Sequence, residues 1–240
     1  MPLVLTLLLF FLTPASARAE PAINCHCYQD RSFDAKRPAA ADPYLLTAAQ
    51  NSLLAATFST PKKTVVQAKM KGVSGKALWL AHWSAADTGL SAKEVLQERD
   101  KAPSWGALMK SLALSPGALD AQLGRALARD APDDDLSEAV IDQVLSSRMD
   151  QAPEELALLR RKGAGDKEVI LATLLARCSG RPASDLLREV NGKRTTWGAL
   201  LQAQELEPGR MEELWTELLR QGERTRAKRP RQEVSPWNGP

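Results

Sequence analysis

The residue types with the most distinctive chemistry gather in one short segment, Asn24–Arg31, which contains Cys25, His26 and Cys27. Thiolate and imidazole groups are good ligands for soft and borderline metal ions, so the segment could hold a metal or take part in thiol redox chemistry. Three ligands in a row cannot easily wrap one ion, however, and the spacings of a Cys-x-x-Cys loop and of a Cys-x-x-Cys-His haem site are both absent. No cofactor is expected, and a metal ion at this segment is the alternative.

The third cysteine, Cys178, gives the thiols a structural interpretation. Outside the cytoplasm thiols tend to be oxidised. A bond from Cys25 or Cys27 to Cys178 would close a loop of about 150 residues, which stabilises a fold by about 4–5 kcal/mol in the chain-entropy treatment. A Cys25–Cys27 bond would instead form a tight, strained and labile ring. We expect a structural disulfide; an inert buried thiol and a metal or redox site are the alternatives.

Known catalytic patterns are absent from the rest of the sequence. It contains only two histidines, no glycine-rich phosphate loop and no Gly-x-Ser-x-Gly nucleophile turn. The carboxylate pairs Glu154–Glu155 and Glu212–Glu213 fall in the first turns of expected helices, where they complement the helix dipole. The acidic run Asp133–Asp135 lacks the spacing of a calcium loop. The sequence therefore favours a protein that is not an enzyme.

The N-terminus predicts export. Leu3–Leu12 is an apolar run interrupted only by Thr6, and Ala17-Arg18-Ala19 offers small residues for cleavage. The run suits a signal peptide with about 7–15 apolar residues and is shorter than the about 20 residues of a membrane span. We expect a signal peptide at 1–19, a mature chain with no transmembrane segment, and a periplasmic or secreted location. No basic residue precedes the run, so a buried or anchoring N-terminal segment is the alternative.

Positive charge is concentrated at the other end of the sequence. The whole chain has a formal net charge of +3, and residues 223–240 combine basic residues and prolines without apolar periodicity. We expect a disordered basic tail there. Such a tail can bind an anionic surface, and for an exported protein an anionic envelope polymer is a better partner than nucleic acid. The candidate residues for this contact are Arg224, Arg226, Lys228, Arg229 and Arg231.

The sequence between these ends contains an internal repeat. Lys71-Gly72, a helical stretch, Gly89 and Trp105-Gly106-Ala107-Leu108 recur as Lys162-Gly163, a helical stretch, Gly180 and Trp197-Gly198-Ala199-Leu200. A repeat of this kind is typical of a tandem duplication. We expect an all-α fold with two units of about six short helices each, at 43–129 and 135–222, after an irregular segment at 20–41.

The repeated pairs Trp105–Gly106 and Trp197–Gly198 each follow an expected helix cap. Tryptophan can bury a large apolar surface against a neighbouring helix, and glycine lets another backbone approach closely. We interpret the pairs as packing devices that join the units; an exposed platform for a ligand such as a sugar is the alternative. His82 is expected to be a hydrogen-bonded residue at the boundary of the core.

Several polar residues mark expected helix starts. Asp42 and Asp166 are expected N-caps, and Ser115-Pro116 is expected to open the last helix of the first unit. Ser91–Glu94 has the pattern of a capping box. Asp130–Asp135 is expected to form an acidic linker between the two units.

The segment Cys25-His26-Cys27-Tyr28, followed by helical units that end in Trp-Gly, resembles a loosely defined set of uncharacterised exported bacterial proteins. The resemblance implies export and helices, and it carries no activity or site residues. We expect an exported, non-enzymatic helical protein that binds another macromolecule, either a protein or an envelope polymer. The alternative is a metal-binding or thiol-redox protein that acts through Cys25, His26 and Cys27.

Overall fold

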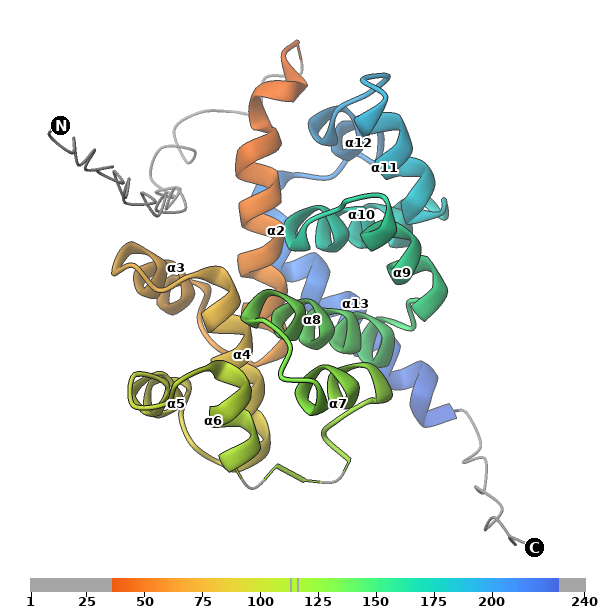
Figure 1. Cartoon of the computed structure of the whole chain (residues 1–240). Helices are drawn as coiled ribbons and strands as arrows, with labels where there is room; N and C mark the ends of the chain where they lie inside the picture. Colours follow the sequence, from red (N-terminus) through yellow and green to blue (C-terminus); the bar gives the residue numbers. More distant parts are fainter. Residues whose placement is uncertain (1–35, 113, 116, 229–240) are drawn as a thin grey trace, which may run out of the picture.

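Helices form all the regular structure in the part of the chain that the structure describes. A computed structural model describes residues 36–112, 114–115 and 117–228, and these contain no strand. The predicted all-α fold class is therefore confirmed. In chain order (Figure 1) the elements are η1 (Pro38–Ala41), α2 (Asp42–Thr57), α3 (Lys62–Met70), α4 (Gly75–Thr88), α5 (Ala92–Arg99), α6 (Trp105–Ser111), α7 (Ala121–Ala128), α8 (Asp133–Met149), α9 (Pro153–Arg161), α10 (Asp166–Ser179), α11 (Ala183–Asn191), α12 (Trp197–Ala203), η2 (Pro208–Arg210) and α13 (Met211–Lys228).

The helices fall into two series, α2–α7 and α8–α13, in which helices of similar length follow one another in the same order. Helices α4 and α10 each have 14 residues, and α6 and α12 each have 7. Gly89 and Gly180 end α4 and α10 in the left-handed conformation, with φ of 75° and 69°. The last pair differs, because α7 has 8 residues and α13 has 18. The tandem duplication itself stays a prediction.

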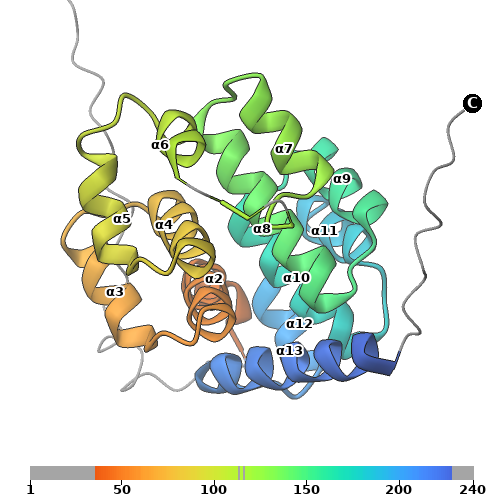
Figure 2. The same ribbon diagram turned by 90° about the horizontal axis from the view of Figure 1, so that it is seen from below.

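The first helix of each series packs against the other series. α2 lies along α10 and α13, whereas α8 lies against α4 and α7. Figure 2 shows the same arrangement from below, with α13 crossing one side of the molecule next to α2. α2 is buried on nearly every side, with both apolar and polar residues covered. The segments 43–129 and 135–222 are therefore interlocked in space, each completing its core with a helix from the other.

The packing of α2 and α8 against the opposite series also connects them to the two Trp-Gly turns. Asp42, the first residue of α2, accepts hydrogen bonds from the backbone N–H groups of Gly198 at 2.8 Å and Trp197 at 3.3 Å. Asp133, the first residue of α8, accepts one from the N–H of Trp105 at 3.3 Å. Both indoles are buried, with 4% of Trp105 and 3% of Trp197 exposed. The two turns therefore share a buried indole and an aspartate cap from the opposite series.

Several predicted helix starts are wrong for the same reason. The N-caps of α2 and α10 are Ala41 and Gly165, because the carboxylates of Asp42 and Asp166 point to partners elsewhere. Helix α7 begins after Asp120, whose carboxylate accepts a hydrogen bond from the N–H of Leu123 at 2.7 Å. Ser115 precedes this helix and instead binds the carboxylate of Asp87.

Other element boundaries differ from the expected ones by a few residues. The expected acidic linker ends at Pro132, because Asp133 opens α8. The 3₁₀ helix η1 falls in the segment expected to be irregular, and α13 runs through Lys228 into the expected disordered tail. The capping box at Ser91–Glu94 is confirmed. Within the described residues, no helix combines the length and the apolar character that crossing a bilayer requires.

Candidate functional site

The chemically distinctive segment of the sequence lies outside the described residues. This applies to Cys25, His26 and Cys27 and to the expected signal peptide at 1–19. Cys178 lies on α10, half-buried and packed against the core, and burial raises the pKa of its thiol, so little thiolate forms at neutral pH. The disulfide and metal hypotheses for these residues stay predictions. Elsewhere, the described part of the chain brings no three His, Cys, Asp or Glu side chains together as a metal site.

The basic tail is described only in part. Arg224 is exposed on α13, and the same helix includes positions 226 and 228. Arg229 and Arg231 lie outside the described residues. The contact of these arginines with an anionic surface stays a prediction.

A second basic surface, which the sequence analysis missed, lies on α3. Lys63, Gln67 and Met70 are exposed on one side of the helix, and Lys71 is exposed at its C-cap. We call these four residues the lysine face. The opposite side of α3 buries Val65, while Met70 is 58% exposed. No ion pair links Lys63 or Lys71 to another described residue.

Charge along the chain is segregated around this helix. No Asp or Glu occurs between Asp42 and Asp87, whereas five lysines do. The matching helix α9 instead has Glu154 and Glu155 in its first turn, so the two series differ in charge at this position. Lys76 lies outside the face and pairs with Asp134 at 2.6 Å. The lysine face therefore keeps a positive potential that no carboxylate of α3 or its flanking loops offsets.

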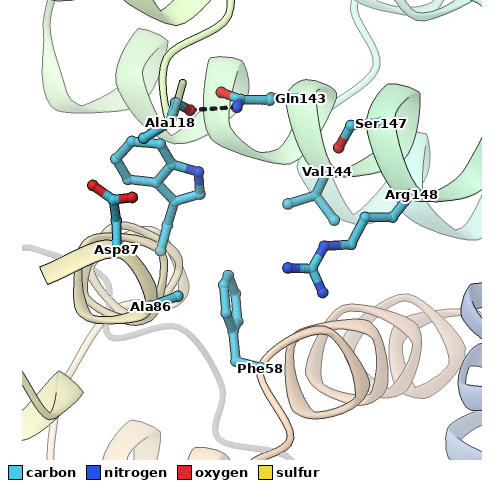
Figure 3. A pocket seen from close by; sticks show the side chains of 9 residues that line it. Phe58, Ala86, Asp87, Ala118, Gln143, Val144, Ser147 and Arg148 are labelled. Atoms are coloured by element: carbon cyan, nitrogen blue, oxygen red, sulfur yellow. Dashed lines mark hydrogen bonds between the residues drawn. The ribbon is translucent and has the colours of Figure 1, made fainter. Parts of the chain in front are cut away.

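A small cavity opens where α2, α4 and α8 meet (Figure 3). We call it the central cavity. Its volume is about 200 Å³, and both apolar and polar side chains line it. The lining residues are Phe58, Trp83, Ala86, Asp87, Ala118, Gln143, Val144, Ser147 and Arg148.

Two polar side chains of the central cavity are fixed by the segment between α6 and α7. Gln143 Nε2 donates to the carbonyl oxygen of Ala118 at 2.6 Å, as Figure 3 shows. Asp87 accepts hydrogen bonds from the backbone N–H of Ser115 at 2.6 Å and from its hydroxyl at 2.5 Å. The Oε1 atom of Gln143 is buried and has no hydrogen-bond partner among the described residues. The oxygen is closed off from the cavity, so the Gln143 side chain is held through its amide nitrogen.

The opposite side of the cavity is held by the end of α2. Arg148 Nη1 donates to the carbonyl oxygen of Thr57 at 2.9 Å. The ring of Phe58 meets Trp79 edge-on at 5.8 Å and stacks on His82 at 5.7 Å. Burial lowers the pKa of His82, so its imidazole is neutral at neutral pH. This uncharged ring supports the cavity wall through Phe58.

A buried charge cluster lies apart from the cavity, between α8, α9 and α10. Arg160 donates to Asp142 at 2.9 Å and to Asp166 at 2.8 Å, and these two carboxylates are 5% and 8% exposed. Glu138 lies at 3.8 Å from the same guanidinium. Burial raises the pKa of Asp142, and Arg160 offsets this rise only in part. The cluster joins three helices, and its groups are occupied with one another.

The matching place in the first series holds a weaker version of this contact. Lys69 of α3 donates to Oε1 of Gln50 on α2 at 2.9 Å. A cation on the second helix of each series thus binds a polar group on the first helix. This correspondence favours a structural role for the Arg160 cluster.

Comparisons with protein-family models, curated proteins and solved structures found no match to this chain. The functional argument therefore depends on the geometry of the described residues. That geometry offers two places for a ligand, the lysine face and the central cavity.

A pattern in the sequence could have predicted the lysine face, but no pattern could have predicted the cavity. The stretch without carboxylates between Asp42 and Asp87 could have pointed to α3. The cavity brings together α2, α4 and α8 through the helix exchange. No local pattern in the sequence indicates such an exchange.

Proposed function

We propose that the protein is an exported, non-enzymatic helical protein that binds an anionic polymer of the cell envelope through the lysine face of α3. The observation that carries this proposal is the pair Lys63 and Lys71, exposed together with Met70 and without a carboxylate on the same helix. Opposite charges that approach at an exposed surface attract each other and increase the rate of encounter.

The arrangement of the two lysines favours a polymer over a single small anion. Lys71 is eight positions after Lys63, which corresponds to about 12 Å along a helix. Their ammonium groups can therefore meet two separate charges of an extended chain. Met70, the residue before Lys71, is exposed and can cover apolar parts of the polymer backbone.

The lysine face and the basic end of α13 lie on different sides of the molecule. Both views place α3 at one edge and the C-terminal end of α13 at the other. A long polymer could contact both surfaces, and binding by the tail alone would leave α3 without a role. Separate variants of the two surfaces distinguish these cases.

The test uses the mature chain with polyphosphate and polyglutamate as probes, measured by titration calorimetry at low and high salt. The double variant Lys63→Gln/Lys71→Gln is expected to bind about thirtyfold more weakly at low salt, because a lysine near an anionic surface contributes about 1 kcal/mol. The control Arg161→Gln/Arg194→Gln removes the same charge from exposed positions outside α3.

Three results would contradict the proposal. One is the absence of binding to both polymers at low salt. Another is an equal loss of affinity in the control, which would mean that only net charge matters. The third is tighter binding to DNA than to either polymer. Export is tested separately by the mass of the mature protein from cells, which should lack residues 1–19.

A further inference from the structure

The surface between α3 and α5 is open, whereas the corresponding surface between α9 and α11 is closed. α9 packs against α11, but α3 and α5 make little or no contact. In the second series Glu155 of α9 accepts a hydrogen bond from the backbone N–H of Ser184 on α11 at 2.7 Å. Lys162, at the end of α9, donates to the carbonyl oxygen of Ser184 at 3.4 Å. Both views nevertheless place α3 and α5 at the same edge of the molecule (Figures 1 and 2).

The first series has different residue types at the places that make these two contacts. Counted from the helix starts, the residues in the places of Glu155, Lys162 and Ser184 are, in that order, Thr64, Lys71 and Lys93. We call these three first-series residues the α3–α5 junction. All three are exposed. The junction therefore carries two lysines and lacks the carboxylate that closes its counterpart.

The junction also presents a backbone donor without an acceptor. The N–H of Lys93 has no hydrogen-bond partner among the described residues, although the N–H of Ser184 has one. The capping box of α5 joins Ser91 to Glu94, so the carboxylate of Glu94 is occupied and does not reach this N–H. Within the described residues no ion pair involves the side chain of Lys93. A carboxylate already binds the equivalent N–H in the second series, so the same chemistry suits the junction.

We propose that the α3–α5 junction binds one carboxylate of the envelope polymer, and that this polymer is a polyglutamate. The inference rests on the proposed function of the lysine face, with which the junction shares Lys71. The ligand carboxylate takes the place that Glu155 holds in the second series and accepts a hydrogen bond from the N–H of Lys93. The ammonium groups of Lys71 and Lys93 offset its charge. A glutamate side chain carries its carboxylate on a flexible stem that can enter between two helices, whereas the charges of polyphosphate lie on its backbone.

The first test uses variants of Thr64 in the mature chain, with polyglutamate binding measured by titration calorimetry at physiological salt. Thr64→Glu supplies the carboxylate that the second series has, and should weaken binding about tenfold or more, because it competes for the donor and repels the polymer. Thr64→Gln has the same size without the charge and should bind like the wild type. The control Gln202→Glu changes the net charge equally at an exposed position on α12, and should also bind like the wild type.

The second test examines Lys93 and the choice of polymer. Lys93→Gln should bind polyglutamate about fivefold more weakly, the effect of one lysine near an anionic surface. In proton–nitrogen NMR spectra the amide of Lys93 should shift when polyglutamate binds, while the amide of Ser184 stays unchanged. Polyglutamate should bind about tenfold more tightly than polyphosphate at physiological salt, because a charge-assisted hydrogen bond persists where surface attraction is screened.

The results separate this inference from the proposed function. If Lys63→Gln/Lys71→Gln weakens binding but Thr64→Glu does not, the lysine face stands and the junction is refuted. An unchanged Lys93 amide refutes the junction as well. Polyphosphate or polygalacturonate binding at least as tightly as polyglutamate refutes the choice of polymer. Absence of binding to every polymer removes the proposed function itself. Circular dichroism checks that each variant folds, and Lys93→Gln decides the question if Thr64→Glu does not.

Discussion

The two repeated Trp-Gly pairs offer a matched test of the packing, in which the same substitution has opposite effects. A methyl group added at Gly198 would lie 2.7 Å from the carbonyl carbon of Pro38 and still closer to its oxygen. A methyl group added at Gly106 would meet nothing closer than 3.7 Å, the distance to Leu136 Cδ1. Gly198→Ala therefore forces η1 away from α12, whereas Gly106→Ala fits without movement.

The magnitudes follow from two opposing terms. Overpacking a tight site costs about 1–3 kcal/mol, and the clash at Gly198 is with backbone, which cannot rotate away. Alanine in place of helical glycine gains about 0.5–1 kcal/mol. We therefore expect Gly198→Ala to lower the free energy of unfolding by about 2 kcal/mol and Gly106→Ala to raise it by about 0.5–1 kcal/mol. For a chain of this size the first change corresponds to a Tm about 4–8 °C lower.

Urea unfolding followed by far-UV circular dichroism measures both variants against the wild type. The m-value should stay the same, so that a shift in midpoint reports stability. The reasoning is refuted if Gly198→Ala is as stable as the wild type. It is also refuted if both substitutions destabilise the fold equally, because that would make the close approach of η1 irrelevant.

The remaining predictions concern α13, the buried charges and pH. Gly222→Ala should cost about 1–3 kcal/mol in urea unfolding, since the added methyl would lie 3.1 Å from the carbonyl carbon of Arg148 and closer to its oxygen; an unchanged midpoint would disprove this contact. Arg160→Met should cost about 3–5 kcal/mol, because it leaves Asp142 buried without its ion pair; a loss below about 1 kcal/mol would mean that the cluster is not closed to water. Burial raises the pKa of Asp142, so the folded chain holds this proton more tightly than the unfolded chain. The stability of the wild type relative to Asp142→Asn should therefore fall as pH rises from the ordinary pKa of an aspartic acid through the raised folded pKa, and parallel pH profiles would contradict this.

Features that depend on neighbours in the sequence were predictable. The capping box at Ser91–Glu94 is complete within four residues, and Thr196 caps α12 by accepting from the N–H of Ala199 at 3.1 Å. Gly89 ends α4 because a left-handed residue there favours glycine. In each case the donor and the acceptor lie within one turn, so the residue types alone specify the contact.

Features that depend on partners far along the chain were not predictable. Asp42 has the residue type and the following proline of an N-cap, but its carboxylate binds the N–H of Gly198, 156 positions away. Asp133 falls in the segment expected to be a linker, but its carboxylate accepts a hydrogen bond from the N–H of Trp105 in the same manner. A capping side chain satisfies whichever helix start lies within reach, and sequence spacing cannot say which one that is.

The paired caps also explain why the helix exchange and the cavity belong together. Because Asp42 and Asp133 bind helix starts in the opposite series, α2 and α8 are each anchored at their N-terminal ends across the molecule. Their C-terminal ends then meet near the cavity, where Arg148 of α8 binds the carbonyl oxygen of Thr57 at the end of α2. The lining of the cavity is therefore set by contacts between the two series, and weakening both caps should lower the stability of the fold. The double variant Asp42→Ala/Asp133→Ala tests this link, since each lost cap costs about 1 kcal/mol. If the double variant is as stable as the wild type in urea unfolding, the caps do not anchor the two helices.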